Sequence, residues 1–276
     1  MNRVVLILMM LISALTSIAD NKEPVCSIDT IYAHARNGEF WAYDALGDCY
    51  RYGKQGLQRS YINALMYYTI GGKSDWQCKA EVNQKNPDDP FAVFLRLMDY
   101  VEKGDNERMA SAIDSLHKAD YHSADIFIEL IKDPDRLSQS EVIEYAQRPS
   151  TDPDAAVFAC AGYALFNMND NGNIKAEWAR PVLVDKVPIM YALFGVELYE
   201  ETLKTDSPDG YDPESKDRDS KARLMAAEYL LKADNYGCLT KQGARLLLHY
   251  FTEDTGSEWV KLSKEDCARI QRLASR

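Results

Sequence analysis

The chain has 276 residues, of which 46% are hydrophobic, and its formal net charge at pH 7 is -11. A chain of this length can bury a large core. Its acidic character argues against binding to nucleic-acid phosphates and against adsorption to an anionic membrane surface.

The first 19 residues are typical of a secretory signal peptide. Arg3 supplies a positive charge, residues 4–15 are almost wholly apolar, and Ser17-Ile18-Ala19 is a small-x-small cleavage site. The apolar run is short for a membrane span, and an uncleaved anchor helix is the alternative. We expect cleavage after Ala19, a mature chain of residues 20–276, and a periplasmic or secreted location with no other membrane contact.

Helical periodicity starts at residues 28–37 and becomes clearest in two neighbouring segments, 42–50 and 61–68. In both, apolar residues recur at i, i+3, i+4 and i+7, which places them on one helical face. A single hairpin this short cannot bury its apolar face, so further copies must stack on it. We therefore expect Leu46 and Leu65 in the core and Gly47 where a neighbouring helix comes close.

The rest of the chain consists of further helical segments separated by breaks. Polar or proline-marked breaks occur at 83–90 and at Asp133-Pro134. No strand-like alternation of any length occurs, so we predict an all-α fold. Further helices are expected at 91–102, 109–119, 124–132, 140–147, 154–166 and 191–200.

An internal similarity supports the idea of repeated units. Residues 112–120 and 226–234 share the pattern A-x-x-x-L-x-K-A-D, and Phe194-Gly195 is similar to Leu46-Gly47. Between them, residues 204–220 form a polar insertion with two prolines and a glycine. Such a composition cannot bury enough apolar surface to order itself, which predicts a loop. Its functional interpretation is a loop that binds a partner or attracts cations.

Residues 41–72 resemble the Sel-one-like repeat family, a relative of the tetratricopeptide repeats, in its exported bacterial type. That family has the pattern A-x-x-x-L-G-x-x-Y-x-x-G-x-G-V followed by D-Y-x-K-A-x-x-W-Y-x-x-A-A. The departures are one extra residue between Gly53 and Gly56, and Ser60, Asn63 and Gly71-Gly72 in place of the usual residues. The matching positions are Ala42, Leu46, Gly47, Tyr50, Gly53, Gly56, Leu57, Tyr61, Ala64, Tyr67 and Tyr68.

The resemblance implies a right-handed α-solenoid of stacked helix hairpins that serves as a protein-interaction scaffold, without catalytic residues. We expect a single helical-repeat domain over residues 20–276, interrupted by the polar insertion at about 204–220.

Six cysteines follow the cleavage site, and an even number in an exported chain suggests disulfides. Sequence alone cannot choose among the 15 possible pairings. Our preferred bridges are Cys49–Cys78 and Cys238–Cys267, each closing a loop of about 30 residues. The alternative is that Cys49 and Cys160, which lie on apolar helix faces, are core thiols.

No motif indicates a catalytic site, a metal or a cofactor. Asn167, Asn169, Asn171 and Gly172 match part of a calcium loop, but position 12 is Trp178, where a bidentate carboxylate is needed. An asparagine-glycine turn is the simpler interpretation. The four histidines form no metal pair at i, i+4 and are expected at the surface or at helix ends.

The strongest binding candidates are Tyr43, Asp44, Asp48, Arg51 and Tyr52, on the face of the first repeat helix that the core does not use. Tyrosine offers a large contact area with one polar group, which suits interfaces. We expect an exported, non-enzymatic scaffold that binds a protein or peptide on a concave helical surface. The alternative is an enzyme, or an accessory that handles glycans or peptides, with a carboxylate-lined cleft.

Overall fold

The computed structural model describes residues 26–166, 178–205, 213–253 and 262–275. Every regular element in these ranges is a helix, which confirms the all-α prediction. None of the helices described has the length and apolar character that a bilayer crossing requires. The expected signal peptide and the calcium-like segment at 167–174 lie outside the described residues.

The described residues form two compact units where the sequence predicts a single domain. Of the described residues, unit 1 holds 26–27 and those within Phe40–Val187, and unit 2 holds Ile28–Glu39 and those from Pro188 onward. The short first helix thus belongs by its packing to the C-terminal unit.

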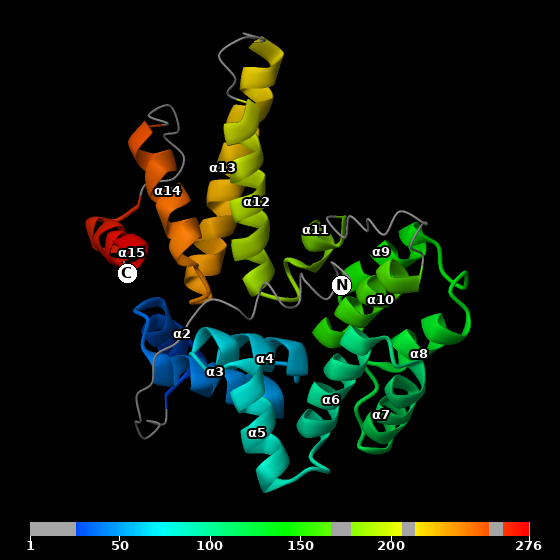
Figure 1. Cartoon of the computed structure of the whole chain (residues 1–276). Coiled ribbons are helices and arrows are strands. Elements are labelled where there is room, and N and C mark those ends of the chain that lie inside the picture. Colours follow the sequence, from blue (N-terminus) through cyan, green and yellow to red (C-terminus); the bar gives the residue numbers. More distant parts are fainter. Residues whose placement is uncertain (1–25, 167–177, 206–212, 254–261, 276) are drawn as a thin grey trace. The chain divides into compact units, whose positions relative to one another are not determined.

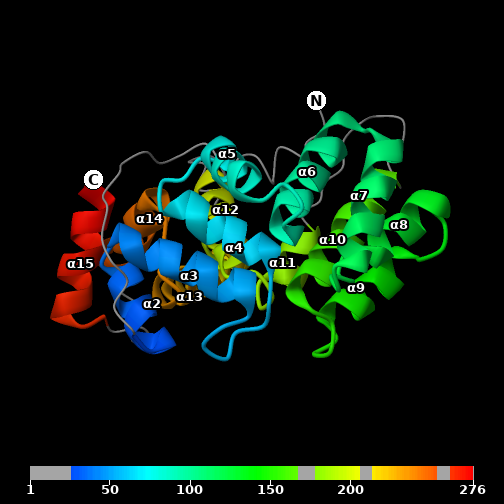
Figure 2. The same cartoon turned by 90° about the horizontal axis from the view of Figure 1, so that it is seen from below.

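In unit 1, each helix packs mainly against helices close to it in sequence, as Figures 1 and 2 show for α3 against α4 and for α6 against α7. One contact breaks this pattern, because α10 also packs against α4. The helices of unit 1 are α3 (Phe40–Tyr52), α4 (Tyr61–Ile70), α5 (Asp75–Lys85), α6 (Pro90–Lys103), α7 (Asn106–Lys118), α8 (Asp125–Lys132), α9 (Gln139–Gln147), α10 (Pro153–Phe166) and α11 (Ala179–Leu183).

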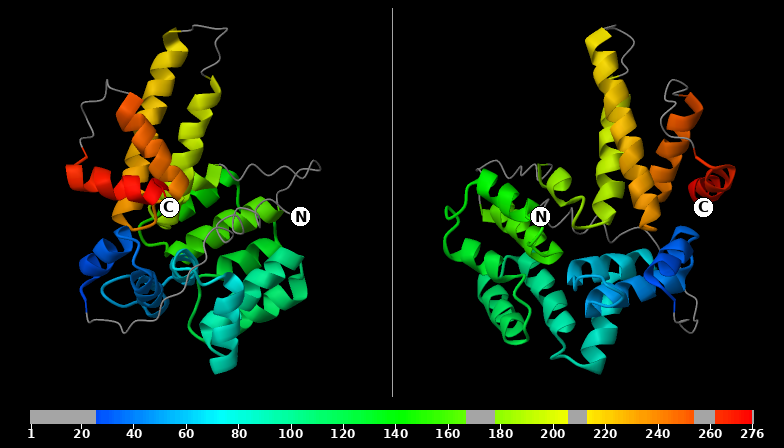
Figure 3. Two further views of the ribbon diagram at one scale, coloured as in Figure 1. Left: turned by 60° about the vertical axis from the view of Figure 1, so that its left-hand side comes forward. Right: turned by 180° about the vertical axis from the view of Figure 1, so that it is seen from behind.

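Unit 2 is built on a long helix pair, α12 and α13, whose members run side by side in Figures 1 and 3. α14 packs against both of them, α15 packs against α14, and α2 packs against α13. The helices of unit 2 are α2 (Ile28–Arg36), α12 (Ile189–Thr205), α13 (Pro213–Asn235), α14 (Lys241–Glu253) and α15 (Lys264–Ser275).

The helix pair α3 and α4 forms as the periodicity predicts. Leu46 is 0% exposed and Leu65 is 4% exposed, so both lie in the core. Gly47 faces the ring of Tyr68 so closely that a Cβ atom at this position would overlap it. Gly195 of α12 has the same role, since a Cβ there would lie 2.9 Å from Leu230 Cγ of α13. Gly47 and Gly195, which occupy similar sequence contexts, therefore both permit two helices to approach closely.

An ion-pair network joins three helices of unit 2. The guanidinium of Arg269 donates to both carboxylate oxygens of Asp234, at 2.5 Å each, and Asp234 is 3% exposed. Arg36 of α2 donates to Asp234 at 3.1 Å and to Asp266 at 3.0 Å. This bidentate, largely buried arrangement ties α2, α13 and α15 together.

A buried carboxylate ties α10 to the start of α4 in unit 1. Asp154 is 0% exposed, and its oxygens accept hydrogen bonds from Ser60 Oγ at 2.5 Å and from Tyr121 Oη at 2.7 Å. They also accept from the backbone N–H groups of Tyr61 at 2.6 Å and Ile62 at 3.3 Å. The first N–H groups of a helix have no partner within it, and the positive end of its dipole favours an anion. Asp154 therefore satisfies the N-terminus of α4 from a helix about 90 residues away.

The polar insertion differs from its prediction. α12 runs to Thr205 and α13 begins at Pro213, so residues 213–220 are helical, and only 206–212 lie outside the described residues. The expectation of a loop over the whole of 204–220 was wrong. Lysine, arginine and glutamate have good helix propensity, and α13 packs its later residues against α12, so the helix extends through a polar start.

Neither preferred disulfide is present. All six cysteines lie in the described ranges, and the structure leaves each as a thiol. Cys238 is 2% exposed and donates to the carbonyl of Ala233 at 3.3 Å, whereas Cys267 is only partly buried. Cys49 and Cys160 are 6% and 2% exposed, which agrees with the alternative of core thiols.

The close approach at Gly47 can be tested by substitution. Gly47→Leu should lower the free energy of unfolding by about 1–3 kcal/mol because the side chain has no space beside Tyr68. Leu46→Ala should cost about 2–5 kcal/mol by leaving a cavity. Urea unfolding measures both changes. Unchanged stability in both variants would contradict the packing of α3 on α4.

The burial of Asp154 predicts a specific pH dependence. Burial raises the pKa of Asp154 to about 6, while the hydrogen bonds from Ser60 and Tyr121 oppose the rise. Since the ordinary value is 3.8, the folded state holds this proton more tightly than the unfolded chain. The contribution of Asp154 to stability is therefore full below about pH 4 and is lost as the pH rises through about 6.

The measurement compares the wild type with Asp154→Asn, which does not titrate. Between about pH 4 and pH 7 the wild type should lose up to about 3 kcal/mol of unfolding free energy relative to the variant. A difference that is independent of pH would contradict this assignment.

The cysteines give a chemical test of burial. Burial raises the pKa of Cys160 to about 12, and it also raises the pKa of Cys238. In the native protein, iodoacetamide should therefore modify the partly buried Cys26 and Cys267 before these two, because the thiolate is the reactive form. Mass spectrometry after denaturation without reductant should find six thiols. A mass deficit of two hydrogens per bridge would support the disulfides instead.

Candidate functional site

A pocket of about 430 Å³ opens beside α3, α4 and α5 of unit 1. Four of the five predicted binding residues line it, namely Asp44, Asp48, Arg51 and Tyr52. These residues follow the spacing i, i+4, i+7 and i+8, so they share one face of α3. The structure thus brings together most of the site that the sequence predicts.

Tyr43 is the exception. Tyr43 is only 9% exposed and packs against the end of α4. A Cβ atom added at Gly71 would lie 2.9 Å from the Cβ atom of Tyr43. The sequence places Tyr43 off the core face, and this placement was wrong. Gly71 has no side chain, which leaves room for the end of α4 to lie against Tyr43.

Asp44 is the least satisfied carboxylate of the pocket. Lys73 Nζ lies 3.4 Å from its Oδ2, while its Oδ1 is buried and has no hydrogen-bond partner. Burial raises the pKa of Asp44, although Lys73 opposes this. The side chain of Asp44 is 39% exposed, so a donor that entered the pocket could form a charge-assisted hydrogen bond with its carboxylate.

The neighbouring Asp48 has a partner. The hydroxyl of Tyr68 donates to Asp48 Oδ1. Burial and the Asp48 carboxylate raise the pKa of Tyr68, so the hydroxyl keeps its proton and remains a donor. This pair crosses from α3 to α4 and forms a fixed inner wall.

Arg51 forms another fixed part of the pocket. Its guanidinium lies 3.0 Å from Asp89 Oδ1 and packs between the rings of Tyr52 and Phe91, with its carbon 4.9 and 4.8 Å from their centroids. Asp89 also accepts the backbone N–H of Phe91 at 2.9 Å and so caps α6. Arginine held by a carboxylate and two aromatic faces has little freedom to move.

Tyr52 forms an exposed rim. Its side chain is 52% exposed, and Lys54 Nζ lies 4.8 Å from its ring centroid. A large exposed aromatic residue beside a charged pocket is a typical contact residue of a protein interface.

Sequence reasoning missed the part of the pocket that comes from α5 and from the turn before it. Residues Lys73, Glu81 and Lys85 line it, and Lys73 Nζ lies 3.8 Å from Glu81 Oε2. α5 was not predicted because it has no clear apolar stripe. Its N-terminus does carry a recognisable pattern: Ser74 and Gln77 form a capping box, the S-x-x-Q signature of a helix start.

The histidines divide into two groups. His34 lies 2.7 Å from Glu39, and the hydroxyl of Tyr199 lies 3.0 Å from His249. His117 and His122 lie together near Asp125. None of the four lines the pocket.

Comparison of the chain with known protein families, with characterised proteins and with solved structures finds no match. The resemblance of residues 41–72 to the Sel-one-like repeats thus stays a prediction.

Proposed function

We propose that this protein is an exported, non-enzymatic scaffold of the helical-repeat type, in which helix hairpins stack as an α-solenoid. In this proposal it binds a protein or peptide segment at the pocket beside α3, α4 and α5. The observation that carries the proposal is the combination of a charged pocket of about 430 Å³ with the exposed rim residue Tyr52. An aromatic rim next to a polar pocket suits a partner that inserts one side chain and covers the rim.

The charge of the pocket indicates which side chain it accepts. Arg51 is paired with Asp89, and Lys73 is paired with both Asp44 and Glu81. The Asp44 side chain is 39% exposed, so a lysine or arginine of the partner could donate to its carboxylate. The net charge of -11 also attracts a basic segment and raises its rate of association.

An enzyme with a carboxylate-lined cleft is the competing interpretation. Asp44 and Asp48 both line the pocket, and two carboxyl groups on either side of a substrate are the arrangement of many glycosidases. However, Tyr68 donates to Asp48, and Lys73 lies beside Asp44. Two carboxylates that already hold partners suit recognition better than proton transfer.

The test starts from a library of linear peptides displayed on phage and selected on the full chain. Selected peptides should be rich in lysine or arginine. Their affinities are then measured by fluorescence anisotropy. Asp44→Asn and Tyr52→Ala should each weaken binding by about tenfold, since losing a residue that carries much of the binding energy costs more than about 1 kcal/mol.

Asp114→Asn is the matched control. Asp114 is an exposed carboxylate paired with Lys118 on α7, away from the pocket, so this variant should bind like the wild type. Melting curves check that all variants stay folded. Peptides without basic residues, or affinities that the two pocket variants leave unchanged, would contradict the proposal.

A further inference from the structure

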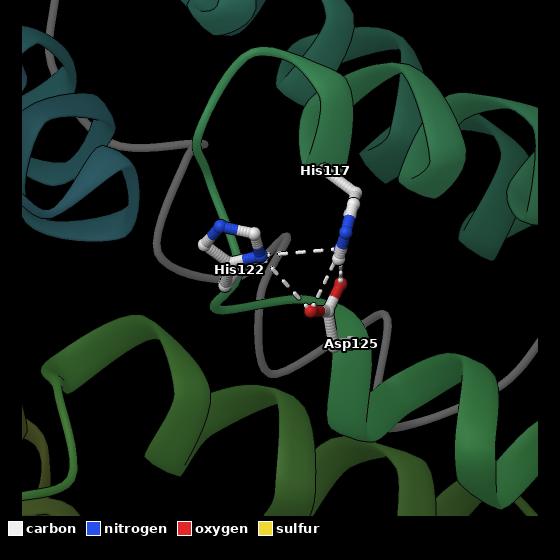
Figure 4. Close-up of side chains that lie close together, drawn as sticks. All are labelled: His117, His122 and Asp125. Carbon is white, nitrogen blue, oxygen red and sulfur yellow. Dashed lines mark hydrogen bonds and ion pairs between the residues drawn. The ribbon is translucent and has the colours of Figure 1, made fainter.

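Two histidines and an aspartate converge at the turn between α7 and α8 (Figure 4). His117 lies in the last turn of α7, His122 in the connection, and Asp125 is the first residue of α8. Their side chains are 55%, 54% and 35% exposed. This cluster is separate from the pocket beside α3, α4 and α5.

The three ligand atoms form a nearly equilateral triangle. His117 Nδ1 lies 3.1 Å from His122 Nδ1 and 3.0 Å from Asp125 Oδ2, and the distance from His122 Nδ1 to Asp125 Oδ2 is 3.2 Å. For metal bonds of about 2.0–2.1 Å, neighbouring ligands lie about 3.3 Å apart in a tetrahedral site and about 2.9 Å apart in an octahedral site. The observed edges fall between these values, and an ion about 1 Å out of the triangle's plane would reach all three atoms.

Protons alone cannot satisfy all three contacts. Each neutral imidazole nitrogen is either a donor or an acceptor, and an ionised carboxylate only accepts. If both Nδ1 atoms carry hydrogen, the two N–H groups face each other. If only one does, the lone pair of the other Nδ1 atom faces a lone pair of Asp125 Oδ2. A cation bound by all three atoms from just outside their plane removes this conflict.

A further carboxylate lies beside the other ring nitrogen of His122. His122 Nε2 lies 3.3 Å from Asp120 Oδ1. With the Nε2 proton directed to Asp120, the Nδ1 lone pair of His122 is available to the ion. Metal-bound histidines almost always have such an outer partner, which fixes the ring and its tautomer.

The backbone that carries these side chains is firmly held. Asp120 adopts a positive φ of 57° after the end of α7. The N–H of Asp120 bonds to the carbonyl of His117 at 3.1 Å, and the N–H of Tyr121 bonds to that of Leu116 at 2.9 Å. This is the Schellman pattern of a helix end. Tyr121 is 1% exposed and is bonded to Asp154, so the core anchors the residue next to His122.

We propose that His117, His122 and Asp125 bind a divalent transition-metal ion, with Zn²⁺ as the best fit to two imidazoles and one carboxylate. Three protein ligands on an exposed surface leave at least one coordination position for water or for a group from outside, the arrangement of open zinc sites. Asp120 acts as the outer residue that orients His122. The site is independent of the proposed peptide pocket.

The experiment measures Zn²⁺ binding to the full chain, prepared without a histidine tag, by isothermal titration calorimetry. Excess Mg²⁺ is present to occupy weak carboxylate sites. The wild type should bind Zn²⁺, whereas His117→Ala and His122→Ala should each weaken binding at this site by at least about tenfold. Asp120→Asn should weaken it by about tenfold or more, as is usual for outer partners of a metal ligand.

His34→Ala is the matched control, because His34 is a partly exposed histidine that also contacts one carboxylate, Glu39, at 2.7 Å. It should bind Zn²⁺ like the wild type. As a second readout, Zn²⁺ should raise the melting temperature of the wild type and of His34→Ala but not of the two site variants. No Zn²⁺ binding by the wild type, or equal binding by wild type and His122→Ala, would overturn the proposal.

Discussion

The buried carboxylate of Asp154 is the constraint on which the arrangement of unit 1 depends. It joins the start of α4, the connection after α7 and the start of α10, which are far apart in the sequence. α4 carries Tyr68 into the charged pocket, and Tyr121 precedes His122 of the proposed metal site. Both candidate surfaces are therefore positioned by segments that meet at this one side chain.

Burying the Asp154 carboxylate costs free energy, which the hydrogen bonds from its partners must offset. An ionised carboxylate without partners is very unfavourable in the interior, and each hydrogen bond it accepts reduces that cost. Burial and the Asp154 charge raise the pKa of Tyr121 well above its usual value, so its hydroxyl stays a donor. In an ideal solenoid each repeat contacts only its neighbours, whereas here α10 returns to α4. This long-range contact adds to the contacts between helices that are close in sequence, and it links the two ends of the α4–α10 segment.

The sequence predicts those parts of the structure that depend on local periodicity. The α3 and α4 pair, the core position of Leu46 and the face that carries Asp44 follow from residue spacing alone. Spacing could not reveal that Tyr43 is enclosed, because this depends on the approach at Gly71. α5 and the first turns of α13 were missed since they lack an apolar stripe. The histidine cluster could not be foreseen, because it depends on a left-handed turn at Asp120.

The central claim is that Asp154 and its donors act as one coupled unit, and a double-mutant cycle tests it most directly. Tyr121→Phe, Asp154→Asn and the double variant are compared with the wild type by urea unfolding. Because the two side chains are in direct contact and buried, the changes in unfolding free energy should be non-additive by about 1 kcal/mol or more. Additivity within about 0.5 kcal/mol would mean that the two residues act independently, and it would contradict the account.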